Sequence, residues 1–484
     1  MLFTSLQYIL FLPLIVGLYW ICPRNLRLPL LLLASYYFYM SWIPAFIVLI
    51  LGMTVFNYFW GAWLYKVEPA KKKAVFTGGI IANLLCLGFF KYTNLLLNTA
   101  AQGVGLFTHH APAWHADIIL PLGISFFAFE FIHYLFEIYR GNSPIKSFVL
   151  FALFASFFPT QIAGPIKRYK DFEKQMLADT HLKLSHFDEG VPLIILGMAK
   201  KLLLADNLAT FVDMGLKDPR VYGAPELWLF MYAFAFQIYF DFSGYTDIGR
   251  GSAMLFGYHI PINFNMPYFA RNVSDFWHRW HISLSTWLRD YLFIPLGGSR
   301  GGRWMTHRNL FLTMAIGGLW HGASWSFVVW GMFHGIALIV HREFQAFKAS
   351  REQLKAFVDS KIGTLLSIIL TFHAACIGWV FFRIQDVSQA FMVAKRMLFF
   401  SPIMTKAENH SFLVLKPELP VLVPVVMMMV ITLLIANLPV SAASEKGWFK
   451  KAPAPLKAAF CTAMLIAIIT FLPDTSAPFI YFQF

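Results

Sequence analysis

Long runs without a single charged side chain are the feature that most restricts what this chain can fold into. Such runs occupy residues 28–65, 309–341, 364–382, 419–444 and 458–473. A helix needs about 20 apolar residues to cross the hydrocarbon core of a bilayer, and each run approaches or exceeds that length. Only 13% of all residues are charged, about half the share of a soluble domain. The pattern predicts an all-α, polytopic integral membrane protein that lives in the lipid bilayer.

The net charge is +14, and the basic residues that cause it are placed as in the loops of a membrane protein, not as in a nucleic-acid-binding surface. Basic residues gather between apolar runs, chiefly at residues 66–73 and 446–457, and such clusters mark cytoplasmic loops. We therefore expect no nucleic-acid partner. Counting crossings from Arg24 forwards and from Phe484 backwards places both termini outside, which is the periplasm for a bacterial inner membrane. Residues 1–23 lack the features of a cleaved signal peptide and are predicted to be a retained first helix.

The order of apolar and basic segments also predicts the topology between the ends. Further crossing helices are expected at residues 28–42, 43–65, 74–97 and 118–139, and external stretches at 92–116 and 384–418. Residues 148–163 and 309–341 have basic residues on both sides, so each is predicted to be a hairpin or to enter and leave by one face. Such segments are tolerated where protein or water buries them, which indicates a cavity. With no soluble domain evident, residues 1–484 are predicted to form a single membrane domain.

The segment DFWHRWHISLSTWLR at residues 275–289 is the first with candidate chemistry. If it is one helix, His278, His281, Ser285 and Arg289 share a stripe opposite the tryptophans. The surroundings are rich in arginine and contain no lysine; the arginines are Arg271, Arg279, Arg289, Arg300, Arg303 and Arg308. Guanidinium groups bind phosphate in bidentate fashion, which suits a phosphorylated donor. The alternative is an interfacial helix whose arginines meet lipid headgroups.

The second segment is GGLWHGASW at residues 317–325, inside an apolar run whose ionisable side chains are His321, His334 and His341. An imidazole at membrane depth is costly and is by default a candidate for function. The alternative is a neutral histidine bonded to a neighbouring carbonyl. The adjacent glycines, Gly317, Gly318 and Gly322, allow backbone or ligand to come close.

A metal site was the third possibility for these histidines. His278 and His281 are three residues apart, and His321 could add a third ligand. However, no cysteine or acidic cluster completes a site, and two histidines at this spacing are a weak signal. No metal site is predicted.

Five stretches together resemble the membrane-bound O-acyltransferase family, and most of all its alginate-type O-acetylation subgroup. They are PTQIAGPIKR at 159–168, DFSGYTDIGR at 241–250, residues 275–296, residues 317–335 and FIYFQF at 479–484. The resemblance implies a ring of about 11 transmembrane helices, with re-entrant or interfacial helices, around a central funnel. It places the family's invariant histidine at His321 and its second polar position at His281, and leaves His278 without a role.

The resemblance implies an enzyme that transfers an acyl group from a cytoplasmic thioester, such as acetyl-CoA, to a hydroxyl. His321 would be the general base, since imidazole titrates near neutral pH. His281 would bind the thioester carbonyl or orient the acceptor, and Arg279, Ser285, Arg289 and Arg300 would bind the donor. The donor is a substrate, and no bound cofactor is expected.

A thioester in the cytoplasm cannot reach a polymer assembled outside, so a periplasmic acetyltransferase or esterase-like partner is expected to receive the acetyl group. The final acceptor would be an exopolysaccharide such as alginate. Two alternatives remain open: transfer of D-alanyl or another acyl group to a cell-envelope polymer, and a non-enzymatic polysaccharide or lipid transporter.

Overall fold

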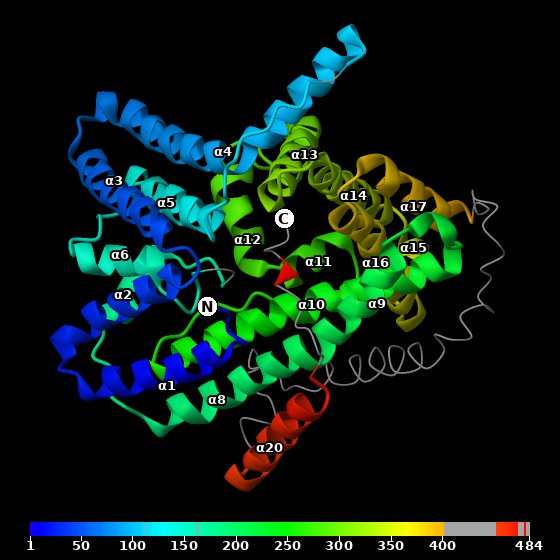
Figure 1. Cartoon of the computed structure of the whole chain (residues 1–484). Helices are drawn as coiled ribbons and strands as arrows, with labels where there is room; N and C mark the ends of the chain where they lie inside the picture. The colour runs from blue at the N-terminus through cyan, green and yellow to red at the C-terminus, as the bar shows by residue number, and fades with distance from the viewer. Residues whose placement is uncertain (111, 162–163, 401–451, 473–478, 481–484) are drawn as a thin grey trace. The chain divides into compact units, whose positions relative to one another are not determined.

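The computed structural model describes residues 1–110, 112–161, 164–400, 452–472 and 479–480, and every regular element within them is helical. The chain can be followed from blue to red in Figure 1. The helices group into two compact units, one of residues Met1–Ile194 and Tyr245–Pro261, the other of Ile195–Gly244 and Ile262–Phe484. The all-α prediction is confirmed for the described residues, while a single domain over 1–484 stays a prediction.

The first unit contains the N-terminal helices, which pack against one another. Its elements are α1 (Leu6–Ile21), α2 (Arg24–Met40), η1 (Pro44–Phe46), α3 (Ile47–Lys66), α4 (Pro69–Thr108), α5 (Ile124–Tyr139), α6 (Phe148–Ser156), α7 (Tyr169–Leu177) and most of α8 (Leu184–Ala199). The main contacts join α4 to α5, α3 to α5, and α2 to α6. The predicted first helix and the helices at 28–42 and 43–65 are confirmed.

Some of the polar side chains buried in this unit are paired. Asn57 of α3 and Asn83 of α4 exchange two amide hydrogen bonds of 3.0 and 2.8 Å. Lys167 lies 2.7 Å from the Glu130 carboxylate and donates to the Thr160 hydroxyl, also at 2.7 Å. An unpaired polar group is expensive away from water, so these pairs make the burial tolerable.

Two expectations about this unit need revision. Residues 92–116 were expected to be an external loop, but α4 continues as helix to Thr108. Its 40 residues span about 60 Å, twice the thickness of the hydrocarbon core. Of residues 148–163, those that the structure describes, 148–161, contain one helix, the nine-residue α6, about 14 Å long and too short to cross. Protein buries α6 almost completely, as expected of a segment that does not face lipid alone.

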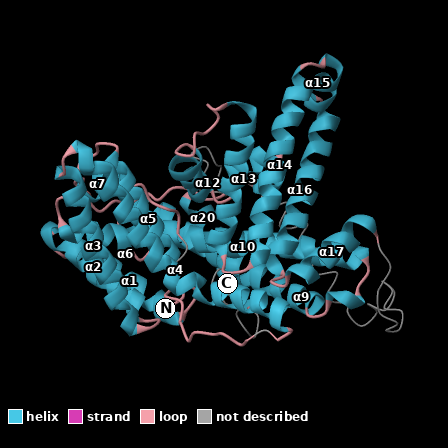
Figure 2. Cartoon of the chain, turned by 90° about the horizontal axis from the view of Figure 1, so that it is seen from above, coloured by secondary structure: helices cyan, strands magenta, loops and turns pink. Residues whose placement is uncertain are grey.

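The second unit carries both histidine motifs. Its elements are η2 (Lys200–Ala205), α9 (Asp206–Leu216), η3 (Pro219–Val221), the first part of α10 (Ala224–Leu255), η4 (Pro267–Phe269), α11 (Val273–Arg279), α12 (Ile282–Leu288), η5 (Arg289–Phe293), α13 (Gly302–His321), α14 (Trp325–Ala349), α15 (Glu352–Asp359), α16 (Lys361–Arg383), α17 (Val387–Phe399) and α20 (Ala454–Thr470). Figure 2 shows α13, α14 and α16 side by side. The apolar run at 419–444 and most of the basic loop at 446–457 lie outside the described residues.

Three helical stretches within the described residues are long and apolar enough to cross a membrane. They are Pro44–Lys66, Pro69–Thr108 and Lys361–Arg383. The expected hairpin at 309–341 is confirmed, because α13 and α14 run back along each other after a short break at residues 322–324.

Glycines let the two arms of this hairpin touch backbone to backbone. A Cβ atom on Gly318 would overlap the carbonyl oxygen of Phe327, and one on Gly331 would overlap the carbonyl oxygen of Met314. Close approach of this kind stabilises helix pairs in membranes through packing, where the hydrophobic effect contributes little between helices.

We therefore predict that Gly318→Ala lowers the stability of the purified protein in detergent, by about 1–3 kcal/mol as for other overpacked cores. Gly88→Ala on α4 is the matched control, because a Cβ atom there meets no atom within 4 Å. Thermal melting of both variants measures the difference. Equal melting temperatures would contradict the role of Gly318 in the hairpin.

Candidate active site

His321 is the last residue of α13, at the point where the hairpin turns. Gly322 has an extended backbone (φ −163°, ψ 158°), which ends the helix. A Cβ atom on Gly322 would overlap the ring of Phe327, so the turn has no room for a larger residue. Ser324 then caps α14 by accepting the Ser326 amide at 3.2 Å. The sequence therefore stops the helix directly after the histidine and holds the imidazole inside the protein, 5% exposed.

Aromatic rings surround the His321 imidazole. Ring centroids lie 5.0 Å away for Trp320, 4.9 Å for Trp330 and 5.3 Å for Phe382, which comes from α16. Edge-to-face contacts at these distances are favourable and directional. They fix the imidazole plane and leave little room for bulk water.

His281 lies at a sharp turn between two short helices. The expected continuous helix over 275–289 is wrong, because α11 ends at Arg279 and α12 begins at Ile282. His281 itself has a left-handed backbone (φ 44°, ψ 54°), a conformation that costs a residue with a side chain about 1–2 kcal/mol. Strain of this kind persists where the surrounding structure imposes it, and it concentrates at functional sites.

Asn263 is the residue that imposes this turn. Its carbonyl oxygen accepts the Ile282 amide at 3.0 Å. Its side-chain Oδ1 accepts both the Ser283 amide at 3.1 Å and the Ser283 hydroxyl at 2.6 Å. Because three donors from the start of α12 converge on one buried asparagine, the chain at His281 has little freedom to relax.

The turn brings His281 next to His321. Their ring centroids are 6.5 Å apart, and the ring of Phe242 on α10 lies 4.7 Å from His281. Hydrogen bonds join heavy atoms about 2.7–3.2 Å apart, so the two imidazoles do not bond each other directly. His281 is fully buried, and neither of its ring nitrogens has a hydrogen-bond partner on another described residue. The pair can therefore act on a third group that reaches both rings.

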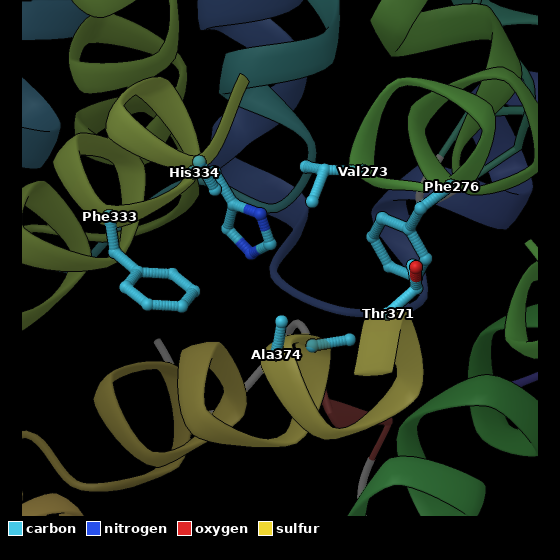
Figure 3. Close-up of a pocket in the computed structure, with 8 residues that line it drawn as sticks. Val273, Phe276, Phe333, His334, Thr371 and Ala374 are labelled. Atoms are coloured by element: carbon cyan, nitrogen blue, oxygen red, sulfur yellow. The ribbon is translucent and has the colours of Figure 1, made fainter. Parts of the chain in front are cut away.

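His334 lies on the other side of Trp330, with ring centroids 4.9 Å apart. It lines a small pocket of about 10 Å³ between α11, α14 and α16 (Figure 3). That volume is at the lower limit for one water molecule. His321 and His334 belong to different helices, because α13 ends at His321 and α14 begins at Trp325.

The predicted stripe of polar residues does not form. His278 is exposed and its Nδ1 lies 2.7 Å from the Ser274 carbonyl, whereas His281 is buried. The Ser285 hydroxyl donates to the Trp280 carbonyl at 3.1 Å. The break at Trp280 and His281 separates these side chains, so the three are not presented on one face.

The arginines of this region differ in what they bind. Arg279 pairs with Asp275 at 2.8 Å, and the exposed Arg289 pairs with Asp290 at 2.8 Å. Arg300 is exposed, and the described residues give its guanidinium no hydrogen-bond or ion-pair partner. Each could still turn to a phosphate, since an exposed ion pair is weak.

Arg303 is instead held by an acid on α14. Both Arg303 and His307 hydrogen-bond the Glu343 carboxylate, His307 at 2.8 Å. Burial raises the pKa of Glu343, but the hydrogen bonds and charges of Arg303 and His307 outweigh it and hold the pKa below its ordinary value. This cluster ties the start of α13 to the end of α14.

Three residues at the site could not be assigned a role from the sequence, although Phe242 lies in the family-like stretch at 241–250. Asn263 is an ordinary loop asparagine 18 residues before His281, and its role follows only from the folded turn. Phe242 and Phe382 are two of 52 phenylalanines. No local pattern marks the ones that meet the histidines.

The described part of the chain is an apolar helical protein in which two histidines lie buried at helix breaks, against aromatic rings. The sequence profile of the membrane-bound O-acyltransferase family matches residues 81–382. The chain is 40% identical over 411 residues to the probable alginate O-acetylase of Azotobacter vinelandii, covering 83% of this chain and 78% of that protein.

Two further relatives show the range of the similarity. A peptidoglycan O-acetyltransferase of Helicobacter pylori is 39% identical over 396 residues, covering 76% of this chain and 73% of that protein. A teichoic acid D-alanyltransferase of Bacillus subtilis is 29% identical over 335 residues, covering 65% and 79%. This chain belongs to the membrane-bound O-acyltransferase family and is an acyltransferase. The resemblance seen in the sequence is confirmed.

Proposed function

We propose that this chain is a membrane O-acetyltransferase that takes acetyl from a cytoplasmic thioester, acetyl-CoA, and passes it through the inner membrane for O-acetylation of an exopolysaccharide such as alginate. The observation that carries this proposal is the juxtaposition of His281 and His321, both buried, with ring centroids 6.5 Å apart. The greater identity to O-acetylases, 39–40% against 29% for the D-alanyltransferase, favours acetyl over D-alanyl.

The two histidines have different tasks in the proposed reaction. A hydroxyl attacks the thioester carbonyl while His321 takes the hydroxyl proton. The donor leaves as a thiolate and receives this proton from His321. His281 hydrogen-bonds the carbonyl oxygen as charge develops on it, or orients the acceptor. The aromatic enclosure of His321 keeps water from competing with the acceptor hydroxyl.

The donor is proposed to bind through Arg279, Ser285, Arg289 and Arg300 at the cytoplasmic mouth of the site. A coenzyme donor presents several phosphates, and exposed guanidinium groups bind them with charge-assisted hydrogen bonds. The exposure of Arg289 and Arg300 supports this assignment most directly.

The proposed setting is a bacterial inner membrane with both termini in the periplasm. About 11 transmembrane helices, with re-entrant or interfacial segments, would form a ring around a funnel that donor and acceptor enter from opposite faces. The basic cluster at residues 66–73 would face the cytoplasm.

A periplasmic acetyltransferase or esterase-like protein is proposed to receive the acetyl group. The nucleophile of such a partner would be the immediate acceptor, and the partner would complete the transfer to the sugar. The reason is steric, because a single side chain can enter a buried site between two histidines more easily than a long polymer can.

His321→Gln should abolish acetylation, because glutamine keeps some hydrogen bonding but cannot take the proton. Loss of a general base costs about 10²–10⁴-fold in rate. Acetyl content of the secreted polymer, normalised to the amount of chain in the membrane, measures the effect. His334→Gln is the matched control and should be milder. Near-normal turnover of His321→Gln would show that this histidine is structural.

Arg289→Ala and Arg300→Ala should each raise the acetyl-CoA concentration needed for half-maximal rate, by about tenfold for a lost charge-assisted hydrogen bond. Arg351→Ala, an exposed arginine outside the motif, should leave it unchanged. Labelled acetyl-CoA titrated into membranes measures this. Identical donor dependence in all three variants would favour the role of these arginines at lipid headgroups.

The purified chain should acetylate polymer poorly on its own and efficiently once the periplasmic partner is added. The comparison is acetyl incorporation into polymer from acetyl-CoA, with and without the partner, and with a partner whose nucleophile is removed. Full polymer acetylation by the chain alone would reject the relay.

A further inference from the structure

Three charged side chains form a buried cluster in the second unit, outside the pair of histidines. The Lys201 ammonium lies 2.7 Å from Oδ1 of Asp206 and 2.8 Å from Oδ1 of Asp241. The three residues are only 2–4% exposed. Lys201 belongs to η2, Asp206 begins α9 and Asp241 lies within α10.

The helices meet closely at this cluster. A Cβ atom on Gly244, one turn after Asp241, would lie 2.7 Å from the Gly197 carbonyl and 3.1 Å from the Lys201 amide. A residue larger than glycine there would push α10 away from η2. The close contact therefore holds Lys201 within reach of Asp241.

Burying charges in this way is expensive, and an apolar replacement of similar volume is often at least as stable. Packing alone therefore does not explain why the cluster is ionic. The second oxygen of Asp241 gives a reason, because it has a partner of its own. Asp241 Oδ2 accepts the backbone amide of Ile480 at 2.7 Å.

This hydrogen bond connects the charged cluster to the candidate active site. Phe479, the neighbour of Ile480, has its ring 6.0 Å from the ring of Phe242, measured between centroids. Phe242 follows Asp241 in the chain and lies 4.7 Å from the His281 imidazole. Phe479 and Ile480 are each only 2% exposed, although they lie close to the end of the sequence.

We propose that Asp241 is a positioning residue: held by Lys201, which also pairs with Asp206, it anchors Phe479 and Ile480, and Phe479 in turn packs against Phe242 and fixes this ring beside His281. We call Phe479 and Ile480 the tail anchor. The role deepens the proposed acyl transfer and rests on it. An aspartate is required, because its two oxygens accept from the lysine and from Ile480, whereas an asparagine must turn its NH₂ group towards one of these donors.

A double-mutant cycle between Asp241→Asn and Phe479→Ala tests the proposal. Acetyl transfer is measured in membranes with saturating acetyl-CoA, and the donor concentration for half-maximal rate is recorded separately. Each variant should lose about tenfold or more in maximal rate with little change in donor requirement, since the tail anchor does not touch the donor. The double variant should be no slower than the slower single one, because both act through one contact. Leu472→Ala is the control, because Leu472 is an exposed residue seven positions before Phe479; its maximal rate should equal that of the parent chain.

Losses that multiply in the double variant would overturn the proposal, because Asp241 would then act independently of Phe479. Phe479→Ala leaves the charged cluster intact, so it reports on the tail anchor even if Asp241→Asn accumulates poorly. A full rate with Phe479→Ala would also overturn it.

The anchoring step has a readout that does not need acyl transfer. A thiol placed by Phe479→Cys should react slowly with a membrane-permeant maleimide, and faster when Asp241→Asn is added. Equal labelling rates would refute the anchor. If labelling behaves as expected but the parent chain transfers no acetyl group, the proposed function fails and the anchor stands.

Discussion

The close backbone contact between α13 and α14 is the constraint on which the site depends. Gly318 and Gly331 let carbonyl groups of the partner helix come where a Cβ atom would lie. The hairpin therefore closes tightly, and the break after His321 falls where Trp330 of the returning helix can cover the imidazole. If larger residues separated the two helices, Trp330 would no longer cover the His321 imidazole and water would reach it. Packing thus sets the chemical environment of His321.

His281 is brought beside His321 by a strained turn, whereas His321 is positioned by the end of a helix. Its left-handed backbone is unfavourable in isolation, and Asn263 supplies the hydrogen bonds that maintain it. A continuous helix over residues 275–289 would put His281 on the same stripe as the exposed His278. The break instead turns His281 inward while His278 remains on the surface.

The sequence predicted what depends on composition and local pattern. Uncharged runs predicted α3 and α16, and the order of apolar and basic segments predicted α4. The basic residues on both sides of 309–341 allowed two alternatives, of which the α13–α14 hairpin is the one observed. His321 stood out as an ionisable group in an apolar run, and His281 as a polar residue of the family-like segment. The break at Trp280 could not be predicted, because the apolar periodicity on its two sides is compatible with one helix. It is imposed by Asn263, which is distant in sequence. The length of α4 was underestimated for a related reason, since an uncharged polar stretch suits a loop and a helix equally.

Buried polar groups in the second unit fall into two kinds. Asp206 and Asp241 each form an ion pair with Lys201, and Asp241 also accepts the Ile480 amide. The ring nitrogens of His281 have no partner on another described residue, although a buried unsatisfied polar group costs about 1–3 kcal/mol. Other buried groups of this unit share this state: neither ring nitrogen of His334 has a hydrogen-bond partner on another described residue. What distinguishes His281 is its position, because its ring centroid lies 6.5 Å from that of His321.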